Sequence, residues 1–321
     1  MRYVDVGGVR LSAVGVGCWQ FGTKDWGYGD TYAKETAAAI VHRALALGIN
    51  LFDTAEAYGF GVSERILGRA LEGHRDEAFI ASKIMPVVPL SAVVQQRAIA
   101  SADRLGVRTI DLYQLHWPNP LVPLSKTMPG MARLQRTGLI RHVGVSNYSL
   151  LRWRAAEEAL GGPVLSNQVK YNLVQRQPEA ELVPWAQAND RLIIAYSPLA
   201  QGLLSTRYDA DHRPGGVRQN NSLFLPDNLA LAGDVFRALR AIADAHGARP
   251  SQVALAWLIR RPNVVVIPGA SSVEQLEANA EAADLELTED EDARLTAASD
   301  AFAPTTGLAA APKLVRSRLG R

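Results

Sequence analysis

Four side chains of types that catalyse proton transfer lie at or just after the ends of short apolar runs: Asp53, Tyr58, Lys83 and His116. An ammonium beside a phenol favours the phenolate, so Lys83 is expected to bring the pKa of Tyr58 from about 10 toward neutrality. Asp53 would keep a desolvated Lys83 charged. His116 could hydrogen-bond a substrate carbonyl. The four residues together predict a site in which Tyr58 protonates a carbonyl oxygen.

These residues need elements that bring them to one place, and the sequence alternates eight short apolar runs with amphipathic helical patterns. Strands are predicted at 13–16, 50–53, 78–83, 111–116, 142–146, 164–169, 192–196 and 264–267. Helices are predicted between them, for example at 37–47, 63–71, 92–105 and 149–160. Such repeated strand and helix units predict an α/β fold, a parallel (β/α)₈ barrel, in one domain over residues 1–321. The carboxyl ends of its strands would then carry the chemistry.

Three additions to the barrel are expected. They are an N-terminal hairpin over 3–12 that turns at Gly7-Gly8, a long loop over 200–228 after the seventh strand, and a C-terminal helix from about residue 287 with a tail. The tail from about residue 300 is expected to be partly mobile. A doubly wound nucleotide-binding fold is disfavoured, because Gly15-Val16-Gly17 is not followed by the third glycine of that fingerprint.

Composition excludes several other classes of protein. The 34 basic and 32 acidic residues give a net charge of only +2, which argues against nucleic acid as a partner. No run approaches the roughly 18 apolar residues of a membrane span, and the N-terminus lacks a signal-peptide core, so we expect a cytoplasmic protein with no membrane partner. A single cysteine and dispersed histidines predict neither a disulfide framework nor a metal site.

Three long motifs resemble signatures of the aldo-keto reductases. The first runs from Asp53 to Gly59 and continues in Ser63-Glu64 and Leu67-Gly68; the second runs from Leu105-Gly106 to Pro118, and the third from Gly138 to Tyr148. The resemblance spans nearly the whole chain in order. It implies a (β/α)₈ barrel with a catalytic tetrad of Asp53, Tyr58, Lys83 and His116. It also implies NADPH-linked reduction of an aldehyde or ketone to an alcohol.

The same resemblance implies a dinucleotide site at the ends of strands five to eight. Ser146, Asn147 and Gln168 would hydrogen-bond the nicotinamide carboxamide, and Tyr196 would stack on its ring. The other implied contacts are Ser197, Leu199, Gln201, Gly202, Gly269, Ser271, Gln275 and Asn279. Asn147 has a structural alternative, since it could cap the helix that begins near Ser149.

The choice between NADPH and NADH depends on the 2′-phosphate. Some family members carry a lysine and an arginine where this chain has Gly269 and Gln275. Arg207 and Arg218, in the preceding loop, could bind the phosphate instead, because guanidinium forms bidentate charge-assisted hydrogen bonds with it. NADPH is therefore preferred over NADH.

A small carbonyl compound is the expected substrate, and the oligomeric state is left open. Trp19 and Trp117 are the aromatic residues expected to contact substrate, with Trp26, Tyr28 and Phe224 as further candidates. One alternative is an NADPH-binding redox-sensing or regulatory subunit with slow turnover, similar to the channel-associated β-subunits of this family. Another is a barrel hydrolase that uses Asp53 and Glu56 as a carboxylate pair.

Overall fold

The computed structural model describes residues 1–22 and 35–312, and within them eight parallel strands form one sheet in the sequential order β3 to β10. The strands are β1 (Tyr3–Val6), β2 (Val9–Ser12), β3 (Val16–Gly17), β4 (Leu51–Asp53), β5 (Phe79–Ile84), β6 (Ile110–Leu115), β7 (Ile140–Ser146), β8 (Ser166–Lys170), β9 (Leu192–Tyr196) and β10 (Val264–Val266), of which β1 and β2 form a separate hairpin. A parallel bridge joins Val14 to Val266, and the Gly15 N–H donates to Val266 O over 2.8 Å. The two edges of the sheet therefore meet, and the predicted barrel is confirmed.

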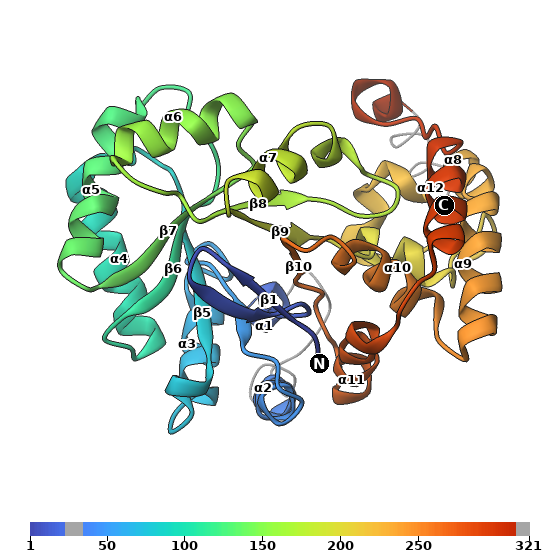
Figure 1. Ribbon diagram of the computed structural model, residues 1–321, viewed down its shortest axis with the longest axis horizontal. Coiled ribbons are helices and arrows are strands. Elements are labelled where there is room, and N and C mark those ends of the chain that lie inside the picture. The colour runs from blue at the N-terminus through green and yellow to red at the C-terminus, as the bar shows by residue number, and fades with distance from the viewer. Residues whose placement is uncertain (23–34, 313–321) are drawn as a thin grey trace.

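Helices surround the strands on the outside (Figure 1). They are α1 (Trp19–Gly22), α2 (Ala37–Ala46), α3 (Val62–Ala70), α4 (Ser91–Leu105), α5 (Leu124–Arg136), α6 (Leu150–Leu160), α7 (Leu182–Ala188), α8 (Pro226–Leu231), α9 (Gly233–His246), α10 (Pro250–Ile259), α11 (Val273–Glu281) and α12 (Glu289–Asp300). In α2 the buried residues Ala37, Ile40, Val41 and Ala44 follow helical spacing along one face. The helices predicted from such patterns match α2, α3, α4 and α6.

The hairpin of β1 and β2 lies at the amino ends of the barrel strands. It turns at Gly7 and Gly8, whose φ angles of 56° and 77° lie in the left-handed region that glycine adopts readily. The Gly7 N–H donates to Asp190 Oδ1 just before β9, and the Ser12 N–H donates to Asn50 Oδ1 just before β4. The predicted hairpin thus covers the end of the barrel opposite to the site described below.

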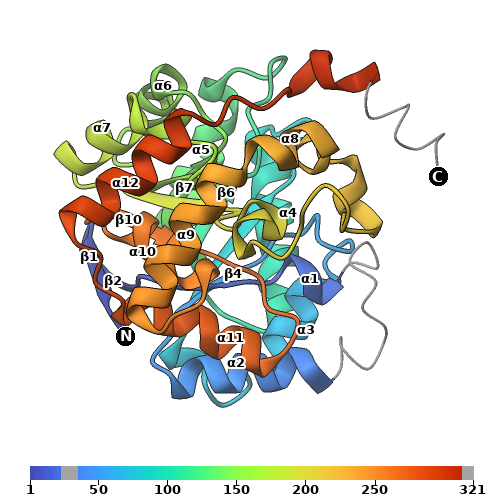
Figure 2. The same ribbon diagram turned by 90° about the vertical axis from the view of Figure 1, so that its right-hand side faces the viewer.

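The long segment after β9 carries short 3₁₀ turns at Ala200–Ser205, Gly216–Asn220 and Ser222–Phe224 before α8. The side chain of Asn228 in α8 binds the backbone of Thr305, donating to its carbonyl and accepting from its N–H, each over 2.9 Å. The chain after α12 therefore crosses to the side on which α1 and α8 lie (Figure 2). Residues 313–321 of the tail, and residues 23–34 with Trp26 and Tyr28, lie outside the described residues.

No helix among the described residues has the length and apolar character that crossing a bilayer requires.

Candidate active site

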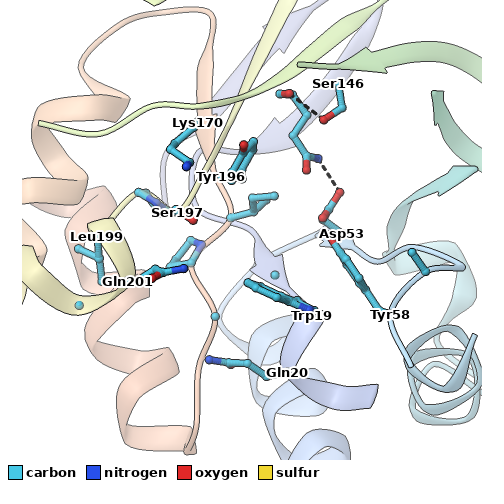
Figure 3. Close-up of a pocket in the computed structure, with 18 of the residues that line it drawn as sticks. Trp19, Gln20, Asp53, Tyr58, Ser146, Lys170, Tyr196, Ser197, Leu199 and Gln201 are labelled. Atoms are coloured by element: carbon cyan, nitrogen blue, oxygen red, sulfur yellow. Dashed lines mark hydrogen bonds between the residues drawn. The ribbon is translucent and has the colours of Figure 1, made fainter. Parts of the chain in front are cut away.

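A cavity of about 530 Å³ opens where the carboxyl ends of the barrel strands converge. The lining includes residues at the ends of β4 and of β6 to β10, which are Asp53, His116, Ser146, Gln168, Tyr196 and Ile267. Figure 3 shows Asp53, Ser146 and Tyr196 around the cavity. Side chains from segments far apart in the sequence therefore share one pocket, as the strand-end argument predicts.

Lys83 is the centre of a polar cluster behind the wall of this pocket, where it contacts the lining residues Asp53 and Tyr58. Its ammonium donates to Asp53 Oδ1 over 2.6 Å, to the Thr54 carbonyl over 2.8 Å and to Tyr58 Oη over 3.2 Å. The Lys83 side chain is 0% exposed and that of Asp53 is 2% exposed. All three donors of the ammonium are used, so the position of Lys83 beside the phenol is fixed.

The second oxygen of Asp53 is bound from the far side of the barrel. Gln168 Nε2 donates to Asp53 Oδ2 over 2.7 Å, and Ser146 Oγ donates to the Gln168 carbonyl over 2.9 Å (Figure 3). These contacts connect β4 with β7 and β8 through the barrel interior. Gln168, expected to contact a nicotinamide carboxamide, therefore also positions the carboxylate that holds Lys83.

The pKa of Tyr58 differs in direction from the sequence-based expectation. Burial raises the pKa of the phenol above its ordinary value, and the nearby charge of Lys83, which lowers it, does not compensate. The prediction of a pKa near neutrality is therefore wrong for the protein alone, because a buried phenolate loses more hydration than one ammonium restores. Tyr58 is protonated at neutral pH, which is the state that a proton donor requires.

Asp53 and Lys83 form a buried ion pair. Burial has the largest single effect and lowers the pKa of Lys83, but the charges of Asp53 and Tyr58 and the hydrogen bonds to both residues together raise it more, so the net direction is upward. Burial also raises the pKa of Asp53, against the effects of Lys83 and Gln168. The raised pKa of Lys83 favours the ionised pair, whereas the raised pKa of Asp53 opposes it. We conclude that the pair is ionised near neutral pH, because both Asp53 oxygens accept hydrogen bonds shorter than 2.8 Å.

His116 presents a neutral imidazole to the cavity. Its ring centroid lies 5.8 Å from that of Tyr58 at an interplanar angle of 81°, and its other neighbour, Trp117, stacks at 5.9 Å. Burial and the charge of Lys83 lower the pKa of His116 to about 3. Nδ1 is buried without a hydrogen-bond partner among the described residues, and a bare lone pair there costs less than an unsatisfied N–H. The ring proton therefore belongs on Nε2.

Asn147 joins the polar cluster to Tyr196. Its Nδ2 donates to Ser146 Oγ over 3.0 Å, and its Oδ1 accepts from Tyr196 Oη over 3.0 Å. Ser149 is the residue that caps α6, accepting from the Arg152 N–H over 3.4 Å. The alternative role of Asn147 as the helix cap is therefore wrong.

The remaining predicted cofactor residues divide into two groups. Those that line the cavity are Ser197, Leu199, Gln201, Gly202, Arg207, Arg218, Gly269 and Gln275. Ser271 and Asn279 contact residues of this first group instead: Ser271 Oγ donates to Gln275 Oε1 over 2.8 Å, and Asn279 Nδ2 donates to the Gly269 carbonyl over 3.4 Å.

Lys170, Met85 and Gln20 line the cavity, although the sequence analysis did not single them out. Lys170 is two residues beyond Gln168 in β8, and Met85 is two residues beyond Lys83. Side chains two residues apart in a strand point to the same face, so this alternation would have predicted that both residues face the cavity. Gln20 lies in the short helix α1, where no such pattern indicates its direction.

Glu56 and Arg97 hold the segment after β5 against the cavity. Glu56 Oε1 accepts from the Met85 N–H, Arg97 Nη1 donates to the Met85 carbonyl over 2.9 Å, and Arg97 Nε donates to Glu56 Oε2 over 3.0 Å. Both predicted hydrolase carboxylates are thus occupied, Asp53 by Lys83 and Glu56 by Arg97. Glu56 is also not among the described residues that line the cavity, so nothing here favours the hydrolase.

A family model described as "Aldo/keto reductase family" matches residues 13–300. The chain belongs to the aldo/keto reductase family. It is therefore an oxidoreductase with the barrel that the motifs implied.

Similar proteins place this aldo/keto reductase among enzymes that differ in cofactor. An uncharacterized oxidoreductase of Mycobacterium tuberculosis is 53% identical over 322 residues, covering 100% of both chains. An NADH-specific methylglyoxal reductase of Escherichia coli is 30% identical, covering 89% of this chain and 94% of its own. A crystal structure of an aldo/keto reductase from Klebsiella pneumoniae in complex with NADP and acetate is 31% identical, with a TM-score of 0.75, and covers 91% of this chain and 93% of that one.

The cavity of this aldo/keto reductase has the donors and acceptors that a nicotinamide dinucleotide needs. Gln20 Oε1 is buried in the lining without a hydrogen-bond partner among the described residues, so a ligand donor would satisfy it. A Cβ atom at Gly269 would lie 2.6 Å from that oxygen, so a larger residue at this position would displace the Gln20 side chain. Arg207 and Arg218 add positive charge for phosphates. The residues present therefore fit the cofactor.

Proposed function

We propose that this protein reduces an aldehyde or ketone to an alcohol with NADPH, using Tyr58 as the proton donor, on a single domain of residues 1–321. One observation carries the proposal: a buried ammonium, that of Lys83, contacts Tyr58 Oη and Asp53 at the wall of the cavity. That arrangement stabilises the phenolate that forms when Tyr58 gives up its proton.

The reaction requires a hydride and a proton. A bound reduced nicotinamide supplies the hydride to the carbonyl carbon. Tyr58 Oη donates its proton to the carbonyl oxygen, and Lys83 stabilises the resulting charge across the 3.2 Å contact. Neutral His116 donates a hydrogen bond from Nε2 to the same oxygen and so orients the substrate. Asp53 keeps Lys83 charged throughout.

The residues that would hold the cofactor contribute to the lining of the cavity. Asn147 and Gln168 would bind the carboxamide, Tyr196 would offer its ring for stacking, and the turn at Ser197–Gly202 would hold the pyrophosphate. Arg207 and Arg218, which line the same cavity as Gln275, support binding of the 2′-phosphate and hence NADPH. The NADH-specific relative makes this preference a question for direct measurement.

The substrate side of the cavity is apolar. Trp19, which lies 6.2 Å from the Tyr58 ring between centroids, Met85 and Trp117 line it. These side chains suit the carbon skeleton of a small carbonyl compound. Phe224, a further aromatic candidate, is buried against Tyr208 and is absent from the described lining.

Tyr58→Phe tests the function. We expect kcat for carbonyl reduction to fall by about 100- to 10,000-fold, while the dissociation constant for NADPH stays unchanged, because only the transition-state proton donor is lost. The rate of NADPH and NADH oxidation with simple aldehydes, ketones and dicarbonyls as substrates gives kcat. Fluorescence titration gives the dissociation constant for NADPH. Tyr3→Phe is the matched control, since Tyr3 Oη donates to the Gly48 carbonyl at the opposite end of the barrel.

Unaltered reduction by Tyr58→Phe would remove Tyr58 from its role. Tight NADPH binding without turnover of any carbonyl compound would favour the alternative, a redox-sensing or regulatory subunit with slow turnover. No binding of either dinucleotide would reject both.

A further inference from the structure

Lys170 ends β8 and lines the cavity near its mouth. In the strand ladder it lies opposite Tyr196 of β9. Gln168, two residues earlier, points inward and binds Asp53, so alternation places Lys170 on the same face, one step nearer the opening. Figure 3 shows Lys170 beside Tyr196, across the cavity from Tyr58. Lys170 therefore lies on the side assigned to the cofactor, away from the proton donor.

The segments that follow β8 and β9 are joined next to this lysine. Asn172 Nδ2 donates to the Ser197 carbonyl over 3.0 Å, and the Tyr171 N–H donates to the Tyr196 carbonyl over 3.4 Å. The backbone after Lys170 is thus hydrogen-bonded to the turn at Ser197–Gly202, which would hold the pyrophosphate in the proposed function. The ammonium and this turn border the same part of the cavity.

The charge of Lys170 is not balanced by the protein. Its side chain makes no hydrogen bond or ion pair with the residues that the structure describes, and Lys170 is exposed. Among the described lining residues the only carboxylate is Asp53, which is already paired with Lys83. The lining also contains Arg207 and Arg218, so the cavity has a clear excess of positive charge. Such an excess attracts an anionic ligand.

The two arginines do not account for all the charge of the dinucleotide. Arg218 Nε donates to the Gln201 carbonyl over 3.0 Å, and Arg207 packs with its guanidinium 5.0 Å from the Tyr208 ring centroid. Assigned to the 2′-phosphate, they leave the pyrophosphate without a cation of its own. Lys170 is the remaining cation of the described lining.

We propose that the ammonium of Lys170 binds the pyrophosphate of the dinucleotide, an inference that rests on the proposed function. Because NADPH and NADH share the pyrophosphate, Lys170 serves both cofactors equally. Arg207 and Arg218 distinguish between them through the 2′-phosphate.

Dissociation constants for NADPH and NADH, measured by tryptophan fluorescence, test this role. Lys170→Met should weaken binding of both cofactors by the same factor, about tenfold at low ionic strength. The loss should shrink at high salt because an exposed contact is screened. Lys170→Arg should restore most of the affinity. Arg218→Met should weaken NADPH more than NADH, and Lys126→Met, at an exposed lysine of α5, is the matched control.

Three results would overturn the role of Lys170 while wild-type protein still binds NADPH. The first is an affinity of Lys170→Met for both cofactors that is unchanged at low salt, with KM for carbonyl compounds also unchanged. The second is a loss of affinity for NADPH alone. The third is an unchanged cofactor affinity with a raised KM for a carbonyl compound that carries a carboxylate, which would place Lys170 against the substrate. If wild-type protein binds neither NADPH nor NADH, the proposed function itself fails, so the two failures are distinguishable.

Discussion

In the proposed reaction, His116 and Tyr58 together set the pH range in which the site can donate a proton. Burial and Lys83 lower the pKa of His116 to about 3, so its charged form appears only in strong acid. Burial raises the pKa of Tyr58 above its ordinary value, so its proton is lost only in alkaline solution. Both residues therefore keep the protonation state that reduction needs across the neutral range.

We expect log(kcat/KM) for carbonyl reduction to be flat from about pH 5 to about pH 8 and to fall in alkaline solution as Tyr58 ionises. A steady-state pH series in buffers of constant ionic strength measures this. An inflection near pH 6.5 that disappears in a His116→Gln variant would show instead that His116 titrates at its ordinary pKa.

At the scale of elements, α4 holds the loop after β5 through one side chain. Arg97 reaches both the Met85 carbonyl and the Glu56 carboxylate, and Glu56 in turn accepts from the Met85 N–H. Burial raises the pKa of Glu56, so its carboxylate depends on these partners to stay ionised. The wall that Met85 contributes to the substrate side is thus positioned from outside the barrel.

Arg97→Met should raise KM for the carbonyl compound several-fold and leave the NADPH dissociation constant unchanged, since Met85 is assigned to the substrate side of the cavity. The free energy of unfolding should fall by about 1 to 3 kcal/mol, because Glu56 loses a charged partner. Steady-state kinetics and urea unfolding measure the two effects. Arg136→Met, at an exposed site of α5, controls for loss of a surface arginine. An unchanged KM would separate the loop position from substrate binding.

In the whole molecule, the hairpin and the cavity lie at opposite ends of one barrel. The hairpin buries Val4, Val6 and Leu11 against the amino ends of the strands, and the cavity opens at the carboxyl ends. Buried side chains of the hairpin belong to the same apolar cluster as those of the strands and helices, so a defect in the hairpin should lower the stability of the barrel. Because the cavity opens at the other end of the strands, we expect its geometry to stay unchanged.

Leu11→Ala should lower the free energy of unfolding by about 2 to 5 kcal/mol, because Leu11 is fully buried and the vacated space does not collapse completely. The affinity for NADPH at temperatures below the transition should not change. Urea unfolding and fluorescence titration measure the pair. Leu151→Ala, at a leucine of α6 that is 80% exposed, is the control and should be nearly neutral. A parallel loss of affinity in Leu11→Ala would show that the two ends are coupled.

The sequence by itself determined the barrel and indicated the members of the polar cluster that we propose as the catalytic site. Parallel strands are buried on both faces, so each reads as a short apolar run, and the helices show their own period of buried residues. Each of these patterns involves only neighbouring residues in the sequence, so the boundaries of the strands and helices could be predicted to within a few residues. Asp53, Lys83 and His116 were recognisable because their types break the apolar runs at strand ends, and the family motifs include all of them together with Tyr58.

Only the tertiary structure decided how these groups act on one another. The direction of the Tyr58 pKa shift depends on how deeply the phenol is buried relative to its distance from Lys83. The hydrogen bond from Gln168 to Asp53 joins residues far apart in the chain. The contacts of Glu56 and Arg97 with the Met85 backbone bring together a helix and two loops. Burial, charge balance and such long-range contacts depend on distances between segments, which no local sequence pattern encodes.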